Sequence, residues 1–205
     1  MDLSRDDSSF HPRHSESQNA LLRSSEQQRA EWIEKSVSYY RKVARLDQDI
    51  PEYFEGDFVL LAKKHYFAIR KVKDGKLLQA EHLYRKIIDE LLQEQEEEEE
   101  CDHSKLAVTT LLYALLTKRM KDPKKTRAVF LNFFKLAVLE REEGAECHCS
   151  AKVMQAYALF EMQQGNRRKS YEIIQKALQF DSSLAPVLQW KQFRDVAKQS
   201  DLLRP

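Results

Sequence analysis

The stretch from residue 157 to 180, YALFEMQQGNRRKSYEIIQKALQF, constrains the fold of this chain more than any other part of its sequence. On both sides of Gly165-Asn166 its apolar residues recur every three or four positions, which is the spacing of the buried face of a helix. A glycine at such a junction favours the end of one helix and the start of another. The stretch therefore predicts two helices joined by a short turn.

The composition of the whole chain favours helices as well. Only 4 of its 205 residues are glycine and 5 are proline. Leucine, glutamate, lysine, glutamine and alanine are abundant, and these side chains lose little rotational freedom in a helix. Because a β-sheet domain of this length needs more turn residues, we predict an all-α protein.

The polarity pattern divides the chain into four segments. Residues 1–22 are polar and are expected to form a disordered tail. A first helix is expected within 23–50, three helix-turn-helix units within 51–181, and a last helix with a short tail within 182–205. The sequence contains neither a signal-peptide pattern nor an apolar run of about 18 residues, so we expect no membrane partner and a location in the nucleus or cytoplasm.

The three predicted units share a frame. Gly75 ends the first helix of the first unit, as Gly165 does in the third. The middle unit is expected to turn at Asp122-Pro123, with extra residues in its turn and with Ala137 as its small packing residue. Because one helical hairpin cannot hide its own apolar face, we predict that the three units stack into a solenoid. The helices near Trp32 and Trp190 are expected to cap its two ends.

The third unit, SAKVMQAYALFEMQQGNRRKSYEIIQKALQFDSS, resembles a tetratricopeptide repeat (TPR) or the related half-a-TPR (HAT) repeat. Ala158, Gly165 and Asp181 match that pattern, whereas Ser170 and Ser182 stand where the family prefers alanine and proline. The resemblance implies a right-handed superhelical array of divergent repeats, since the unit spacing exceeds the usual length. The last unit is also similar to the N-terminal TPR module of spindle-checkpoint kinases, although this chain has no kinase domain.

The sequence contains no pattern typical of a catalytic or cofactor site. It lacks G-x-S-x-G, a glycine-rich phosphate loop and H-E-x-x-H. Its four glycines are too scattered to form a phosphate cradle. We therefore expect no enzyme activity, no cofactor and no small-molecule substrate, and we interpret His65 and His82 as helix-surface or packing residues.

Cysteine and histidine residues precede two of the predicted units. Cys101 and His103 lie before the middle unit, and Cys147, His148 and Cys149 lie before the third. Thiolates and imidazoles at one edge could hold zinc, but this spacing does not match known structural zinc modules. We therefore expect no metal. Because an odd number of cysteines also argues against a disulfide framework, we interpret the cysteines as free thiols in loops.

Charge is unevenly distributed along the chain, although the formal net charge is only +1. Acidic stretches at 94–102 and 140–146 fall between the predicted units, and fraying is expected in the first of them. Basic residues gather at the turn inside each unit, where they also complement helix dipoles. Stacked turns would form a basic edge, whose candidate partner-binding residues are Lys76, Lys121, Lys124, Lys125, Arg127, Arg167, Arg168 and Lys169.

The TPR resemblance implies that residues of the first helix in each unit line a groove. The lysine/asparagine clamp that chaperone-binding TPR proteins use is absent, because its positions hold His65, Leu111 and Gln155. A longer peptide or a helix is therefore the expected occupant. The candidate groove residues are His65, Lys73, Lys118, Arg119, Lys152, Gln155 and Gln163.

These observations favour a non-catalytic TPR-like adaptor that binds another protein. The checkpoint-kinase resemblance suggests a setting in chromosome segregation, such as kinetochore or spindle-checkpoint assembly. The alternative is an RNA-processing factor of the HAT type whose basic edge contacts RNA. Few aromatic residues interleave with the basic clusters, which disfavours base stacking. The identity of the partner and the oligomeric state stay open.

Overall fold

The computed structural model describes residues 13–44, 52–97, 103–139 and 148–201. All regular secondary structure within these residues is helical, so the all-α prediction is confirmed. None of the described helices is long and apolar enough to cross a membrane. The first helix begins at Arg13, earlier than the predicted boundary at residue 23.

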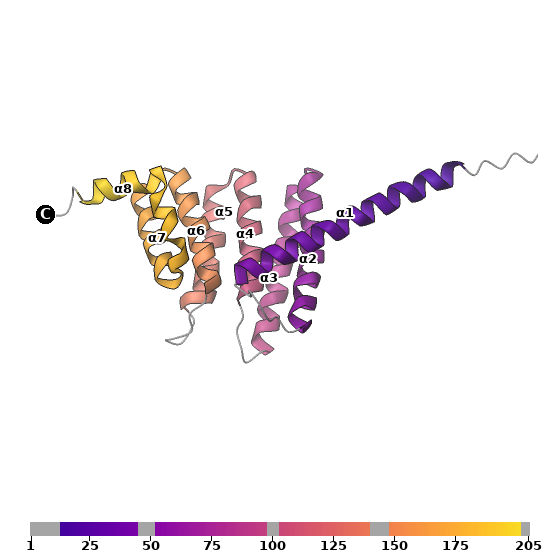
Figure 1. The fold of residues 1–205 in the computed structure, drawn as a ribbon, viewed down its shortest axis with the longest axis horizontal. Coiled ribbons are helices and arrows are strands. Elements are labelled where there is room, and N and C mark those ends of the chain that lie inside the picture. The colour runs from indigo at the N-terminus through magenta and orange to yellow at the C-terminus, as the bar shows by residue number, and fades with distance from the viewer. Residues whose placement is uncertain (1–12, 45–51, 98–102, 140–147, 202–205) are drawn as a thin grey trace, which may run out of the picture.

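The described helices stand mostly side by side in a row (Figure 1). Antiparallel neighbours form three pairs, and η1, a π-helical segment, extends the second helix of the middle pair, while η2, a 3-10 segment, precedes the last helix. The elements are α1 (Arg13–Ala44), α2 (Glu52–Lys73), α3 (Leu77–Glu97), α4 (Ser104–Arg119), α5 (Pro123–Phe134), η1 (Lys135–Leu139), α6 (His148–Gln163), α7 (Arg167–Phe180), η2 (Ser182–Gln189) and α8 (Lys191–Asp201).

The pairs α2–α3, α4–α5 and α6–α7 have the same turn. Each turn has three residues, 74–76, 120–122 and 164–166, and their backbone N–H groups donate to the preceding helix in the same order. The middle residue has a positive φ in all three: 75° at Gly75, 59° at Lys121 and 84° at Gly165. The prediction of extra residues in the middle turn is therefore wrong. The predicted position of the turn at Asp122-Pro123 is correct, but its length was misjudged, because Lys121 adopts the left-handed conformation that usually favours glycine.

The shared turn also corrects the register of the middle pair. A small, buried side chain follows each positive-φ residue by five positions, at Ala80, Thr126 and Ser170. Thr126 donates its hydroxyl to the Asp122 carbonyl, and the Ser170 hydroxyl donates to a carbonyl of α6. Ala137, the small packing residue that the sequence suggested for the middle unit, is buried but lies farther along, in η1.

The three turns lie along one edge of the row, the upper edge in Figure 1. A core of buried apolar side chains runs from α1 to α6, and a second cluster joins α6, α7, η2 and α8. Phe193 and Val196 of α8 are buried, and α8 packs against α7 and η2 at the C-terminal end of the row. Trp190 has an extended backbone just before α8, so it is not part of that helix.

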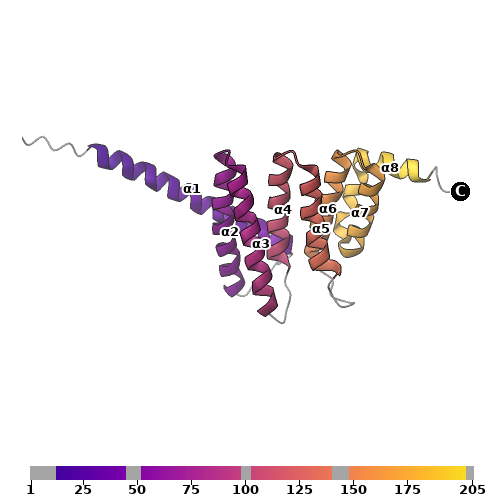
Figure 2. The same cartoon turned by 180° about the vertical axis from the view of Figure 1, so that it is seen from behind.

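Helix α1 lies across the row and does not cap its end. It packs against α2, α4 and α6, the first helices of the three pairs. It crosses in front of the row in Figure 1 and behind it in Figure 2, and its N-terminal part projects beyond α2. Val37 and Tyr40 are buried and Trp32 and Ile33 are half-buried, so these four residues anchor α1. The prediction of an N-terminal capping helix is thus corrected, because the apolar stripe of α1 faces the first helices.

Candidate binding surfaces

His65, predicted to face a partner, lies in the interior where α1, α2 and α4 meet. Its side chain is 0% exposed. The Thr109 hydroxyl donates to the Lys105 carbonyl at 2.9 Å, so its oxygen accepts from His65 Nε2–H at 3.1 Å. His65 Nδ1 then accepts from the Tyr40 hydroxyl at 2.7 Å. This histidine joins three helices and is not available to a partner.

The environment of His65 keeps its imidazole neutral. Burial, together with the nearby positive charge of Lys64, lowers the pKa of His65 to about 3. A neutral ring has one donor nitrogen and one acceptor nitrogen, which matches the two hydrogen bonds with Thr109 and Tyr40. The interpretation of His65 as a packing residue agrees with this geometry, and its place among the groove candidates does not.

The other predicted groove residues reach solvent to different degrees. Lys73, Lys118, Arg119 and Gln163 are exposed, whereas Lys152 and Gln155 are half-buried. Lys152 Nζ lies 3.8 Å from the buried Asp181 carboxylate, so it is partly engaged within the protein. On α4, the exposed positions form one stripe that consists of Leu115, Lys118 and Arg119, and Leu115 is 62% exposed. Lys118 and Arg119 are thus predicted groove residues that are exposed, and Leu115, which was not predicted, lies beside them.

A buried carboxylate, Glu161 of α6, binds two residues of the predicted basic edge. Its side chain is 0% exposed. Arg127 donates to both oxygens at 2.7 and 3.0 Å, and Lys169 Nζ donates to Oε1 at 2.9 Å. Asn166 also donates to Oε2. Burial raises the pKa of the Glu161 carboxyl, but the hydrogen bonds from Arg127, Asn166 and Lys169 outweigh it and hold that pKa well below its usual range.

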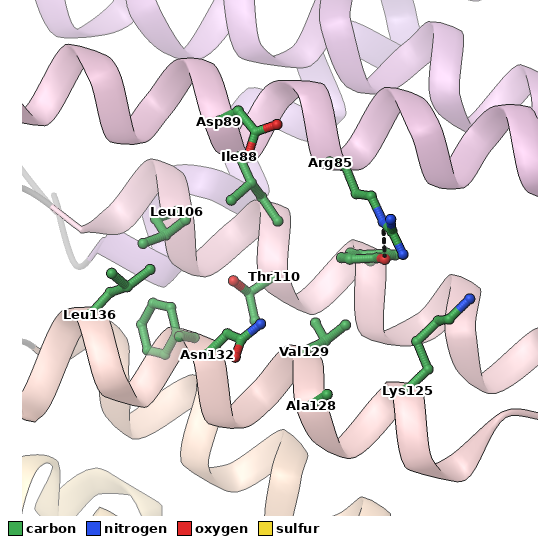
Figure 3. A pocket seen from close by; sticks show the side chains of 12 residues that line it. Arg85, Ile88, Asp89, Leu106, Thr110, Lys125, Ala128, Val129, Asn132 and Leu136 are labelled. Carbon is green, nitrogen blue, oxygen red and sulfur yellow. Dashed lines mark hydrogen bonds between the residues drawn. The ribbon is translucent and has the colours of Figure 1, made fainter.

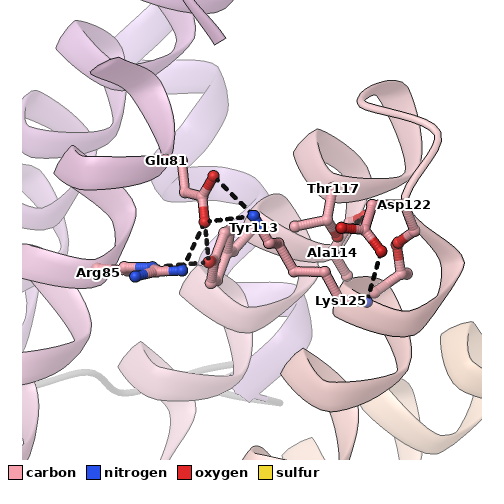
Figure 4. Close-up of polar contacts among 8 residues, drawn as sticks. Glu81, Arg85, Tyr113, Ala114, Thr117, Asp122 and Lys125 are labelled. Atoms are coloured by element: carbon pink, nitrogen blue, oxygen red, sulfur yellow. Dashed lines mark hydrogen bonds and ion pairs between the residues drawn. The ribbon is translucent and has the colours of Figure 1, made fainter. Parts of the chain in front are cut away.

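Glu81 of α3 forms a second cluster of this kind (Figure 4). Its carboxylate accepts from Arg85 at 2.7 Å, from the Tyr113 hydroxyl at 3.1 Å and from Lys125 Nζ at 3.2 Å. Burial raises the pKa of Glu81, and the bonds from Lys125 and Tyr113 lower it further than burial raises it. Glu81 thereby joins α3 to the next pair.

The tyrosines and lysines of the two clusters stand at equivalent positions of adjacent pairs, whereas the two carboxylates do not. Tyr113 and Tyr157 stand eight residues before the positive-φ residue of their turns, and Lys125 and Lys169 stand four residues after it. Lys169 Nζ donates to the Tyr157 hydroxyl at 2.8 Å. Helix α5 supplies Lys125 to one cluster and Arg127, which binds Glu161, to the other. The middle pair is therefore held by charge on both sides.

The structure divides the predicted basic edge into two groups. Lys125, Arg127 and Lys169 are bound to buried carboxylates, and Arg168 pairs with Glu172 at 3.0 Å on the surface of α7. The second group is exposed, and the described residues place no carboxylate within ion-pair distance of it: Lys76, Lys121, Lys124 and Arg167. Sequence reasoning missed both buried carboxylates. The signal was a charged residue, Glu161, inside the otherwise apolar run YALFEM.

A cavity of about 440 Å³ lies between α3, α4 and the α5–η1 helix (Figure 3). Its apolar wall includes Leu106, Val129 and Phe133, which are all buried. Its two cationic residues, Arg85 and Lys125, are those that bind Glu81. Glu81 and Asp89, the acidic residue of the lining, together balance these two cations, so the cavity presents little net charge to a ligand.

The possible zinc ligands are not gathered in the described part of the chain. No group of three or more His, Cys, Asp or Glu side chains is arranged there to hold a metal ion. Cys149 lies in the first turn of α6, is 3% exposed and is disulfide-bonded, so the prediction of a free loop thiol is wrong for it. Cys101, Cys147 and the acidic residues 98–102 and 140–146 lie outside the described residues.

Comparison with protein families, with curated proteins and with solved structures found no match to this chain. Functional interpretation therefore starts from the repeated pairs and from the exposed residues they carry.

Proposed function

We propose that this protein is a non-catalytic adaptor, built as a short right-handed solenoid of three TPR-like hairpins, that binds another protein. The observation that carries the proposal is the repeated pair: three turns share one hydrogen-bond order, one positive-φ position and one small residue five positions later. Repeats of this kind form extended surfaces for recognising peptides or helices. The checkpoint-kinase resemblance suggests chromosome segregation as the setting.

Three buried ionisable groups with shifted pKa values, His65, Glu81 and Glu161, support binding over catalysis. Catalytic residues with shifted pKa values face a cleft that admits substrate. His65, Glu81 and Glu161 instead direct their polar atoms to neighbouring helices, and each is less than 10% exposed. Their unusual environments are explained by packing between helices.

The stripe of α4 is the best candidate contact for a protein partner. Leu115 offers an exposed apolar side chain, and Lys118 and Arg119 lie one turn farther along the same helix. Lys73 of α2 and Gln163 of α6 are exposed at corresponding ends of the neighbouring first helices. An apolar anchor flanked by cations favours a partner with an apolar residue near carboxylates.

Site-specific crosslinking tests this proposal. A photo-crosslinking amino acid replaces Leu115 in the full chain expressed in cells, and the products are separated and identified by mass spectrometry. We expect a discrete protein product that is lost in the Lys118→Glu/Arg119→Glu variant. The matched control, Lys135→Glu/Lys176→Glu, changes the net charge equally at other exposed positions. Equal crosslinking in both variants, or no discrete product, contradicts the proposal.

RNA binding is the second candidate function, and the exposed cations of the basic edge favour it. Lys76, Lys121, Lys124 and Arg167 have no carboxylate partner among the described residues. Binding through several phosphates loses affinity steeply between low and moderate salt. Tight, steeply salt-dependent binding of single-stranded RNA that fails when these four residues become glutamate would replace the adaptor proposal.

A further inference from the structure

A second cavity, of about 250 Å³, lies between α1 and the C-terminal half of α2. Ser25, Gln28 and Trp32 of α1 form one side, and Tyr66, Ile69, Arg70 and Lys73 of α2 belong to the other. The cavity exists because α1 crosses the row at an angle and its outer part diverges from α2 (Figure 1). Its volume suits one large side chain of a partner.

One wall of this cavity is aromatic and held in place. The rings of Trp32 and Tyr66 lie 5.6 Å apart at an interplanar angle of 60°. The Arg29 guanidinium lies 5.7 Å from the Tyr66 ring centroid and 5.5 Å from that of Phe67, which positions it for cation–π attraction to both. The Trp32 side chain is also half-buried and packs against the main core cluster. A ligand therefore meets a preformed apolar surface, which reduces the entropy cost of binding.

The rim of the cavity is cationic. Arg70 and Lys73 belong to the last turn of α2, and both are exposed. Neither has a carboxylate within ion-pair distance among the described residues. By contrast, Lys64 in the middle of α2 forms an ion pair with Glu90 at 2.8 Å. Lys71 and Lys76 add positive charge beside the rim, and Asp74 offsets part of it. The helix dipole accounts for a basic last turn, but not for an aromatic wall beside it.

We infer that this cavity binds an acidic segment of a partner protein, with an aromatic or aliphatic side chain of that segment against Trp32 and Tyr66 and its carboxylates on Arg70 and Lys73. The inference rests on the proposed protein-binding function and names the chemistry of the partner. Charge complementarity selects an acidic segment, and the aromatic wall selects an apolar anchor within it. RNA fits less well, because the rings of Trp32 and Tyr66 are tilted at 60° to each other and do not form a platform on which successive bases stack.

The test uses the full chain with Trp190→Phe, which leaves Trp32 as the single tryptophan. The probe is a synthetic peptide with one phenylalanine between two runs of four glutamates, titrated while the emission of Trp32 is recorded. We expect a saturable change in emission, an affinity about tenfold lower when alanine replaces the phenylalanine of the peptide, and no change when lysines replace its glutamates.

Two protein variants locate the binding. Arg70→Glu/Lys73→Glu should weaken binding of the glutamate peptide at least tenfold, and Gln28→Glu, which adds a carboxylate at the opposite wall, should weaken it about threefold. Neither change touches an anchor of α1, so folding is preserved, which circular dichroism verifies. The matched control Lys135→Glu/Lys176→Glu should bind within twofold of the parent.

Several results would overturn the inference. These are equal affinity for the phenylalanine and alanine peptides, equal weakening by the control variant, or no saturable signal at millimolar peptide. Binding of a uridine oligonucleotide that depends on Arg70 and Lys73, without peptide binding, assigns the surface to RNA. If the peptide fails while the Leu115 crosslink persists, the adaptor proposal stands and this cavity is not its site. If both fail, the adaptor proposal falls too.

Discussion

Replacing Glu161 with glutamine removes a buried negative charge that two cations and an amide surround. Arg127 then loses a bidentate partner, and Lys169 keeps only a neutral acceptor. Removing one partner of a fully buried ion pair costs about 3–5 kcal/mol. Here the cationic side chains are 30% and 47% exposed, so water can solvate them after the change. We therefore expect a loss of about 3 kcal/mol, the low end of that range.

This loss is measurable by urea and thermal denaturation at pH 7, followed by circular dichroism. For a domain of this length, about 3 kcal/mol corresponds to a decrease in Tm of about 6–12 °C. The control is Glu172→Gln, which breaks the exposed pair with Arg168 on α7 and should cost less than about 0.5 kcal/mol. If Glu161→Gln costs no more than this control, the buried cluster does not hold the pairs together.

The same carboxylate makes a prediction for acid conditions. The pKa of Glu161 lies below its ordinary value of 4.5 in the folded protein. Its contribution to stability is therefore fully present above about pH 4.5 and is lost as the pH falls through the folded-state pKa. Between pH 5 and pH 3 the wild type should lose free energy of unfolding faster than Glu161→Gln. Parallel curves for the two proteins would show that Glu161 is not stabilised as a carboxylate.

Three further predictions follow from single residues. The pKa of His65 is lowered to about 3 in the folded protein, so near pH 6 the unfolded chain binds a proton that the folded protein excludes. The free energy of unfolding should therefore fall by up to about 1.4 kcal/mol per pH unit from pH 6 to pH 5. In urea titrations His65→Gln should remove this contribution to the pH dependence, and an unchanged pH dependence contradicts the prediction. Tyr40→Phe leaves His65 Nδ1 unpaired and should cost about 1–2 kcal/mol in urea denaturation, whereas a neutral effect would mean that the bond adds nothing. Lys121→Gly relieves the strain of a positive φ of 59° and should increase the free energy of unfolding by up to about 1 kcal/mol, which thermal denaturation detects as a higher Tm. A lower Tm would show that Lys121 is not strained.

The repeated turn shows where local sequence is sufficient and where it fails. Gly75 and Gly165 mark two of the turns, because glycine adopts positive φ readily. Lys121 holds the same conformation although lysine does not favour it, so the residue type alone does not mark this turn. The mark of this turn is the start of the next helix: the Asp122 carboxylate accepts from the Lys125 N–H at 2.9 Å, and Pro123 begins α5.

The candidate surfaces were predictable only in part. Basic residues at the turns follow from composition, and the turns lie along one edge as expected. Which of those residues face solvent was not predictable from local sequence. Glu81 lies 44 residues from Lys125, and Glu161 lies 34 residues from Arg127. Pairing over such distances depends on how the helices stack.

The sequence by itself determined that this protein is helical and paired, because helical periodicity and scarce turn residues are local properties. The tertiary structure decided the position of α1, which packs on α2, α4 and α6. Its Tyr40 forms a hydrogen bond with His65, so α1 covers a residue that the sequence had assigned to the groove. It also decided which charges remain for a partner. Burial selects among ionisable side chains according to what surrounds them in space, and local sequence carries little of that information.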